Sequence, residues 1–237
     1  MTEFLFRENS YLRSTAATVV SLTAEGGIVL DRTVFYATSG GQPGDSGRLE
    51  RADGTVVAIA AAVHPDGDKT AIVHVPADGE VRPEVGETLV AVIDWDRRLK
   101  LMRMHTALHL VTVVLPFPIT GASVSEDKGR VDFNMPETPG DPQAIEDRLN
   151  ALVDADLPVS AEWISDAELE ANPGLIKSMN VRPPMGQGRV RLVRIGDVDL
   201  QPCGGTHVAR TREIGPLRLG KIEKKGAINR RINLLFG

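Results

Sequence analysis

Residues 94–115 read DWDRRLKLMRMHTALHLVTVVL, and in this stretch the hydrophobic pattern changes from the period of a strand to the period of a helix. Leu101, Met104, Leu108 and Val111 follow one another at spacings of three or four residues, which places them along one side of a helix. Such an apolar stripe predicts a helix that packs against a hydrophobic core. We therefore predict that this helix opens a second part of the chain.

The ends of the predicted helix carry residues that favour helix boundaries. Asp94 or Asp96 is a suitable N-cap, because a carboxylate accepts hydrogen bonds from the free N–H groups of the first turn. Pro116 ends the helix, since its ring removes a backbone donor. His105 and His109 are one turn apart, so their side chains project from the same face.

The chain before this helix has the pattern of short strands separated by tight turns. Glycine and aspartate mark the turns, as at Asp53-Gly54 and Asp78-Gly79. The predicted strands cover residues 17–22, 28–36, 47–51, 55–63, 70–75 and 88–93. Short strands at this spacing predict a small β-barrel domain over residues 1–93.

The chain from residue 94 onward mixes helices with strands. Ile145, Leu149 and Leu152 recur at helical spacing and predict a second helix over residues 142–155. Further strands are predicted at residues 130–133, 159–164, 190–195, 198–201, 215–225 and 227–235. We predict an α+β fold, in which the N-terminal β-barrel is followed by an α+β domain over residues 94–237 with an antiparallel sheet and packed helices.

The composition indicates an ordinary globular protein of 237 residues, 42% hydrophobic and 25% charged. A net charge of −5 argues against a protein that coats nucleic acid without specificity, since such binding needs many phosphate contacts. No stretch is apolar for long enough to span a bilayer, and the N-terminus lacks the layout of a signal peptide, so we expect a cytoplasmic protein without a membrane partner. The single cysteine cannot form an internal disulfide. No feature indicates an obligatory protein partner.

Two fragments, His105-Thr-Ala-Leu-His109 and Cys203-Gly-Gly-Thr-His207, each carry two metal-binding side chains four residues apart. Either fragment alone is weak evidence, but three of the five histidines and the only cysteine lie in them. Imidazole nitrogen and thiolate sulfur favour zinc over calcium or magnesium. We therefore predict one Zn²⁺ ion, in a catalytic or a purely structural site, which the spacing does not distinguish. The other two histidines are expected to be surface or half-buried structural residues.

Near its end the chain is basic, with five cations against one acid, Glu223, between residues 221 and 231. The cations are Lys221, Lys224, Lys225, Arg230 and Arg231. On charge alone, a solvated edge and a phosphate-binding surface are equally good interpretations.

Several stretches together carry a resemblance to a known family. They are RMHTALH at 103–109, DLQPCGGTHV at 199–208, EIG at 213–215, KG at 225–226, RRI at 230–232 and FYATSGGQPGDSG at 35–47. The chain resembles the editing domain of alanyl-tRNA synthetases and the free-standing AlaX trans-editing proteins, with the last stretch similar to the glycine-rich motif of the barrel beside that domain. The resemblance covers nearly the whole chain and is closest in layout to the intermediate-length members.

The resemblance implies a hydrolase that acts on mischarged tRNA(Ala). Such an enzyme cleaves the ester that joins serine, or sometimes glycine, to the 3′ end of the tRNA, and so protects the fidelity of translation. A synthetase pocket shaped for alanine discriminates against an added hydroxyl by only about a hundredfold or less, so a second site must remove the error.

The resemblance also implies roles for particular residues. The zinc ligands are His105, His109, Cys203 and His207. The residues expected to line the catalytic site, with backbone N–H groups facing a developing oxyanion, are Thr106, Gly204, Gly205 and Thr206. The ion either activates water or positions the tRNA terminus, and a retained cysteine ligand favours positioning.

Substrate recognition is assigned to two further places. Gln42, presented by Gly40 and Gly41, is expected to contact the substrate or the tRNA end, although stabilising the turn is an equally good interpretation. Leu108 stands where the synthetase domain often has threonine, so another group must read the serine hydroxyl, and Ser123 is the candidate.

The residues expected to bind tRNA are Arg103, Lys221, Lys224, Lys225, Arg230 and Arg231. Three alternatives stand beside this interpretation. A threonyl-type editing domain shares both metal spacings but usually has arginine and proline inside the cysteine motif, whereas this chain has Gly204-Gly205-Thr206. A zinc-stabilised RNA-binding module without catalysis is the second, and a metal-dependent hydrolase of a small ester is the third.

Overall fold

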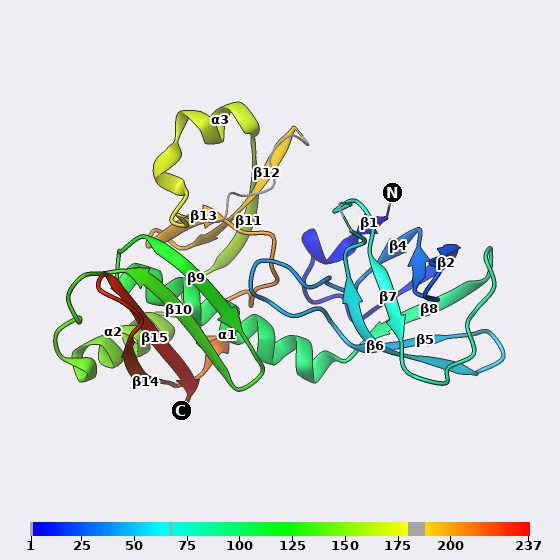
Figure 1. Cartoon of the computed structure of the whole chain (residues 1–237), viewed down its shortest axis with the longest axis horizontal. Helices are drawn as coiled ribbons and strands as arrows, with labels where there is room; N and C mark the ends of the chain where they lie inside the picture. Colours follow the sequence, from blue (N-terminus) through cyan, green and yellow to red (C-terminus); the bar gives the residue numbers. More distant parts are fainter. Residues whose placement is uncertain (1, 67, 180–187) are drawn as a thin grey trace. The chain divides into compact units, whose positions relative to one another are not determined.

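The computed structural model describes residues 2–66, 68–179 and 188–237. The chain divides into two compact units, Met1–Leu99 and Lys100–Gly237. The first contains a closed β-barrel, and the second combines antiparallel sheets with helices (Figure 1), which confirms the predicted α+β fold with an N-terminal barrel. Within the described residues, no helix has both the length and the apolar character needed to cross a lipid bilayer.

The barrel is built from strands that each pair with two neighbours. In order around the barrel they are β2 (Ser14–Leu22), β3 (Ile28–Leu30), β7 (Val73–Pro76), β6 (Val56–Val63), β5 (Gly47–Glu50) and β8 (Thr88–Ile93). Alternate side chains point inward along each strand, so that residues such as Leu49, Val57 and Ile59 are buried in the core.

The strand predicted over residues 28–36 is wrong, because the chain forms two short strands there. β3 ends at Leu30, and β4 (Arg32–Thr33) pairs in parallel with β1 (Glu3–Phe4) outside the barrel. Between them, the Asp31 carboxylate accepts hydrogen bonds from the backbone N–H groups of Thr18, at 2.7 Å, and Arg32, at 2.9 Å. A side chain that binds backbone donors in this way competes with the strand ladder. A 3₁₀ turn, η1 (Leu5–Arg7), follows β1.

His74 on β7 is fully buried, whereas His64 is half-buried. The expectation that both lie at or near the surface is therefore wrong for His74. Its Nδ1 lies 3.0 Å from the Ile28 carbonyl oxygen and its Nε2 lies 2.8 Å from the Thr33 hydroxyl, so the neutral ring is satisfied on both sides. Burial lowers the pKa of His74 to about 4. It is a structural core residue.

The glycine-rich loop between β4 and β5 contains a tight turn over residues 39–42. Ser39 and Gln42 exchange two backbone hydrogen bonds, of 2.9 and 3.1 Å. Gly40 and Gly41 between them have φ angles of 57° and 84°, and positive values at both central positions are what a type I′ turn requires. The turn by itself thus accounts for both glycines.

A buried ion pair ties the same loop to the start of helix α1 (Trp95–Val114). Arg98 has no exposed surface, and its guanidinium binds both carboxylate oxygens of Asp45. The guanidinium also donates to the carbonyl oxygens of Val34, at 2.8 Å, and Ser10, at 3.0 Å. Asp45 in turn accepts from the backbone N–H of Tyr36 at 2.6 Å. Both charges are therefore fully hydrogen-bonded.

The second unit contains two sheets. One has the order β14 (Leu217–Lys224), β15 (Asn229–Phe236), β10 (Lys128–Asn134) and β9 (Ile119–Val124), and the other has the order β11 (Val159–Ser165), β12 (Arg189–Ile195) and β13 (Asp199–Pro202). The remaining elements are α2 (Pro142–Asp154), α3 (Asp166–Ala171) and the 3₁₀ turns η2 (Pro173–Leu175) and η3 (Thr211–Ile214). The helices predicted at 94–115 and 142–155 are confirmed, whereas β9 and α3 were not predicted.

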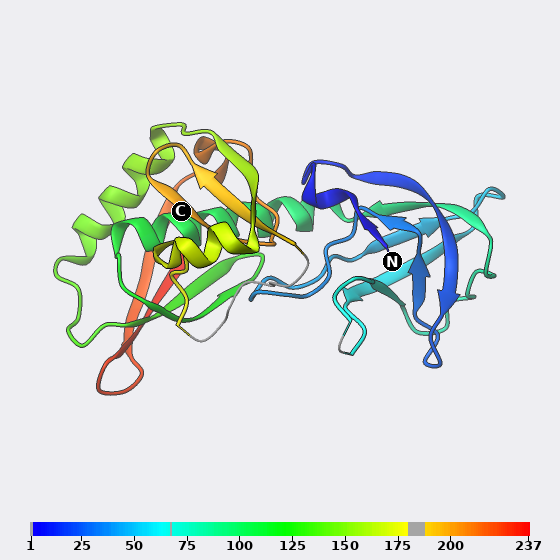
Figure 2. The ribbon, with the colours of Figure 1, turned by 90° about the horizontal axis from the view of Figure 1, so that it is seen from above.

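Helix α1 lies against one face of the four-stranded sheet (Figures 1 and 2). The contact is close at Gly129 on β10, where an added Cβ would lie 2.8 Å from the sulfur of Met104 and 3.0 Å from Leu108. Leu101, Met104, Leu108 and the rest of the predicted apolar stripe are buried. The stripe therefore packs against the sheet as the sequence predicts. This packing fixes the orientation of the helix about its own axis.

Candidate metal centre

The four predicted ligand side chains meet in the second unit. His105 and His109 project from one face of α1, and Cys203 and His207 lie in the loop that follows β13. Ligand atoms from all four residues lie within 4.8 Å of one another. The Cys203 sulfur is 3.5 Å from His105 Nε2 and 3.3 Å from His207 Nε2. Two fragments far apart in the sequence thus form a single cluster.

The spacing of these donor atoms fits zinc. Tetrahedral zinc has bonds of about 2.0–2.1 Å to nitrogen and about 2.3 Å to sulfur, which places neighbouring ligand atoms about 3.3–3.6 Å apart. The two sulfur–nitrogen distances, 3.5 and 3.3 Å, agree with this separation. The donor set of three imidazoles and one thiolate also suits zinc, whereas magnesium and calcium take oxygen ligands.

Thr106 orients one of the ligands from within α1. Its hydroxyl donates to the Met102 carbonyl oxygen at 2.9 Å and lies 3.1 Å from His207 Nδ1. Because the hydroxyl proton is already used, the oxygen accepts from a protonated Nδ1, which leaves the Nε2 lone pair of His207 free for the cluster. Thr106 is fully buried. The structure therefore places it behind a ligand, rather than in the lining of the site.

Asp199 on β13 orients a second ligand. Its carboxylate is 5% exposed and accepts from His109 Nδ1 at 3.1 Å, Lys177 Nζ at 2.5 Å and Gln201 Nε2 at 2.8 Å. With Nδ1 bound in this way, Nε2 of His109 is directed at the other ligands. Burial favours the neutral acid, but the bonds to His109 and Lys177 lower the pKa of Asp199 to about 2. The carboxylate is ionised at neutral pH.

The sequence carried a signal for Asp199 that the prediction of the site did not use. Asp199 and Gln201 alternate with Leu200 in a strand, so their polar side chains share a face just before Cys203. Lys177 gives no such signal, because it lies in a loop after η2 and reaches Asp199 only in the folded chain.

The electrostatics of the cluster favour a deprotonated cysteine. Burial raises the pKa of the Cys203 thiol, but the electrostatic influence of the neighbouring His105 and His207 side chains lowers it well below its ordinary value. Burial, with the charge of His105, lowers the pKa of His207 to about 3. Burial by itself lowers the pKa of His109, but hydrogen bonds to Asp199 and Cys203 raise this pKa to about 9. A metal ion bound at this cluster would displace a proton from His109 at neutral pH.

The cysteine loop is held in place and partly exposed. Arg191 on β12 donates to the carbonyl oxygens of Cys203, at 2.9 Å, and Gly205, at 3.0 Å. Gly205 and Thr206 are buried, whereas Gly204 is exposed and Cys203 is half-buried. The cluster therefore lies close to the molecular surface at Cys203 and Gly204.

Ser123, the candidate for reading the serine hydroxyl, is half-buried on β9 and pairs with Arg130. Its neighbour Val124 pairs with Gly129, which faces α1. Since successive side chains of a strand point to opposite faces, Ser123 points away from the helix that carries His105 and His109. In the first unit, Gln42 is fully buried, and its contact with a substrate stays a prediction.

The six predicted tRNA-binding residues fall into two groups. Arg103 donates to the Ile214 carbonyl oxygen at 2.9 Å and stacks on Phe236. Arg230 is buried and donates to the carbonyl oxygens of the β14–β15 loop and of Pro136, and Arg231 binds both oxygens of Asp132. These three hold the fold together. Three exposed lysines form the other group: Lys221, Lys224 and Lys225.

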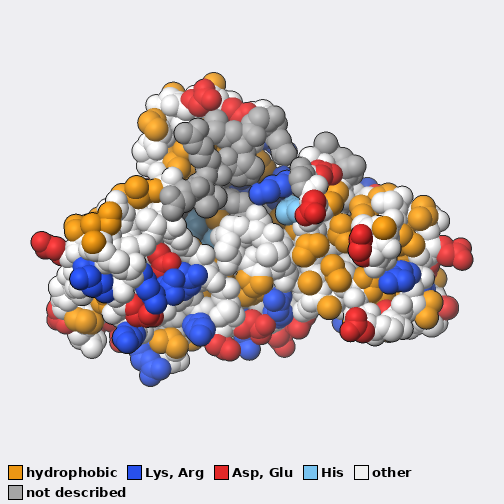
Figure 3. Space-filling view, in the orientation of Figure 1, with side chains coloured by type: hydrophobic (Ala, Val, Ile, Leu, Met, Phe, Trp, Pro, Cys, Tyr) orange, Lys and Arg blue, Asp and Glu red, His pale blue; other side chains and the backbone are white. Residues whose placement is uncertain are grey.

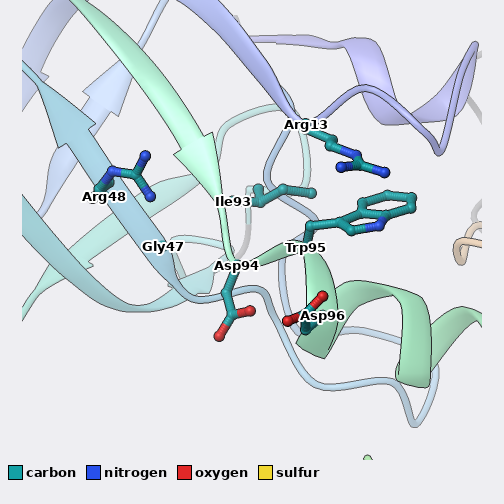
Figure 4. Close-up of a pocket in the computed structure, with 7 residues that line it drawn as sticks. All are labelled: Arg13, Gly47, Arg48, Ile93, Asp94, Trp95 and Asp96. Atoms are coloured by element: carbon teal, nitrogen blue, oxygen red, sulfur yellow. The ribbon is translucent and has the colours of Figure 1, made fainter.

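The first unit has a hollow of about 450 Å³ at the end of the barrel (Figure 4). Arg13 lies over the Trp95 ring at 4.4 Å, and the other lining residues include Arg48, Asp94 and Asp96. Charges of both signs line it, and it contains none of the predicted site residues. We assign it no role in the chemistry of the metal centre.

Comparison with known proteins points to tRNA editing. Residues 190–233 match the family described as the threonyl and alanyl tRNA synthetase second additional domain, and residues 9–97 match tRNA synthetases class II (A). The chain is 36% identical to the alanyl-tRNA editing protein AlaX-M of Methanosarcina acetivorans, over 98% of each chain. It is 32% identical to the alanyl-tRNA editing protein AlaX-L of Pyrococcus horikoshii, over 100% of this chain and 58% of that protein. It is 36% identical to the alanine–tRNA ligase of Pyrobaculum calidifontis, over 94% of this chain and 25% of the ligase.

Proposed function

This chain belongs to the AlaX family of alanyl-tRNA editing proteins, and from that premise we propose that it hydrolyses the ester of seryl-tRNA(Ala), and of glycyl-tRNA(Ala), in a zinc-dependent reaction. The observation that carries the proposal is the cluster of His105, His109, Cys203 and His207, which fits a zinc ion and lies close to the molecular surface beside Gly204. An ester at the end of a tRNA needs a site of this kind, close to the surface. The names of the relatives supply the substrate class.

The four ligands would hold the zinc, which when bound supplies a positive charge that polarises or positions an ester carbonyl. Thr106 and Asp199 keep the Nε2 atoms of His207 and His109 directed at the ion. Gly204, Gly205 and Thr206 follow Cys203 directly, and we propose that backbone N–H groups here stabilise the oxyanion that develops on the carbonyl. Thr106 then acts as a positioning residue, since its hydroxyl is occupied by Met102 and His207.

A contact between Gln42 and the tRNA end stays a prediction that the burial of Gln42 does not favour, since the tight turn by itself accounts for Gly40 and Gly41. The outward direction of Ser123 does not favour it as the group that reads the serine hydroxyl. The exposed position of Gly204 makes the cysteine loop a better place for that contact.

The decisive experiment compares the release of labelled serine and alanine from the same tRNA(Ala). We expect rapid release of serine and little release of alanine, because the protein must spare the correct product. Equal rates would remove the proofreading function, and tRNA binding without hydrolysis would favour the non-catalytic RNA-binding module. Faster hydrolysis of seryl-tRNA(Thr) would favour a threonyl-type editing domain.

The metal requirement is tested with His109→Ala. We expect this variant to lose zinc and to lose deacylation by about a hundredfold or more, since it removes a ligand and leaves Asp199 without its histidine. Zinc content is measured on the same samples as the rate. The matched control is His64→Ala, which removes a half-buried histidine of the barrel unit and should leave both quantities unchanged. Full activity in a zinc-free His109→Ala protein would rule out a metal role.

A further inference from the structure

We propose that the outer face of the four-stranded sheet binds the phosphates of an RNA duplex, and so guides the acceptor stem of the substrate tRNA. The outer face is the side of β14, β15, β10 and β9 that points away from α1. This inference rests on the proposed function, because it supplies a docking surface for the same substrate. The proposed surface adds Lys128, Arg130 and Arg218 to the predicted tRNA-binding residues. It leaves out Arg103, Lys224 and Arg230.

The strand register decides which side chains point outward. On β10, Gly129 faces α1, so its neighbours Lys128 and Arg130 point to the opposite side. Lys128 pairs with Leu235 of β15, and Leu235 pairs with Arg218 of β14. Directly paired residues share a face, so Arg218 and Lys128 stand on the same side of the sheet.

The outer face carries an excess of positive charge. Five cations and two acids belong to it: Lys128, Arg130, Arg218, Lys225 and Arg231, with Asp132 and Glu223. An excess of three charges thus stands on a chain whose net charge is −5. Lys221 adds a further exposed cation at the bulge of β14. The space-filling view shows Lys and Arg side chains gathered over this sheet (Figure 3).

Part of this charge is available to a ligand. Arg130 and Arg231 both bind Asp132, and Lys225 binds Glu223 at 2.6 Å. In contrast, Lys128 and Arg218 are exposed and form no ion pair within the described residues, and the same holds for Lys221. These three cations lie toward one end of the sheet, beside the ion-paired Asp132 and Arg231, and such a group can contact several phosphates along a backbone.

The rest of the outer face favours a duplex backbone over single-stranded bases. The aromatic residues of these strands, Phe133 and Phe236, lie on the other side, where Phe133 is buried and Phe236 stacks on Arg103. Without an outward aromatic ring the face cannot stack on unpaired bases. Gly121 and Gly220 add no side chain to this face, since Gly121 pairs with the outward-facing Asp132 and a Cβ on Gly220 would lie 3.0 Å from the Cβ of Asn233. A-form RNA is recognised in this way, through its shape and its phosphates.

The test replaces the three unpaired cations in the full-length zinc-loaded protein, as Lys128→Gln/Arg218→Gln/Lys221→Gln. The matched control is Lys69→Gln/Lys100→Gln/Arg148→Gln, which removes the same charge from exposed residues outside the sheet. For the sheet variant we expect KM for seryl-tRNA(Ala) to rise about tenfold with kcat nearly unchanged, because the lost contacts position the RNA without touching the ester. Binding to uncharged tRNA should also become less salt-dependent, with a slope shallower by about 2–3.

The outcomes separate the two proposals. If the wild-type protein deacylates seryl-tRNA(Ala) and the sheet variant behaves like the control variant, the docking surface is wrong and the proposed function stands. If the wild-type protein does not deacylate the substrate at all, the proposed function itself fails. A parallel loss of kcat or zinc content in the sheet variant would also overturn the inference, since it would show a change in the metal centre.

Discussion

At the scale of single residues, Asp199 shows how a predicted metal ligand, His109, is kept in place. Its ionised carboxylate binds His109 Nδ1 and is itself held by Lys177. We expect Asp199→Asn to lower zinc affinity about 10- to 100-fold, because a neutral amide binds the imidazole less strongly and leaves the Lys177 charge unpaired. A competition titration with a chromophoric chelator measures this. Asp197→Asn, the same change at an exposed turn position, is the control, and equal affinities for the two variants would contradict the role of Asp199.

The same residues show what the sequence reveals about a site. The clustering of His105, His109, Cys203 and His207 was predictable, because each pair has a fixed spacing and these four residues include three of the five histidines and the only cysteine of the chain. The groups that support them were not predicted, since Asp199 and Thr106 resemble any other polar residue until the fold brings them to His109 and His207. Hydrogen bonds between distant segments leave no periodic trace in a sequence.

At the scale of elements, the start of α1 is joined to the glycine-rich loop by a buried charge. Replacing Arg98 by Met leaves the Asp45 carboxylate, which is 1% exposed, without its partner. We expect Arg98→Met to lower the free energy of unfolding by about 3–5 kcal/mol, and Arg98→Met/Asp45→Asn to recover part of this loss. Urea unfolding followed by tryptophan fluorescence measures both. Arg194→Met breaks an ion pair that is 40% exposed on both sides and should cost less than about 1 kcal/mol. Similar losses for Arg98→Met and Arg194→Met would contradict the prediction.

Helices and strands were predicted well where one buried face gives their hydrophobic residues a regular spacing. The stripe on α1 and the alternation along β6 and β8 arise from one buried face, so the sequence records them. β9 was missed, because Ile119–Val124 contains Gly121, Ala122 and Ser123 and lies at the edge of its sheet. Its strand conformation depends on pairing with β10, a partner that its own composition does not indicate.

At the scale of the whole molecule, the two compact units should respond differently to zinc. All four ligands belong to the unit Lys100–Gly237, and none belongs to the barrel. Zinc at a hundred times its dissociation constant stabilises the state that binds it by about 2.7 kcal/mol. We therefore expect zinc to slow hydrogen exchange in the part of α1 that carries His105 and His109 and in β13 with the loop after it, while β2, β5, β6 and β8 exchange at the same rate with and without the metal.

Hydrogen exchange followed by mass spectrometry of peptides resolves these segments, and Cys203→Ala provides a protein in which the effect should be lost. Helix α1 makes the experiment informative, because it begins in the barrel unit at Trp95 and continues into the unit that holds the ligands. If protection stops within α1, the units unfold separately and zinc stabilises only the second. Equal protection of the barrel strands would contradict the prediction, because it would show that the two units open together.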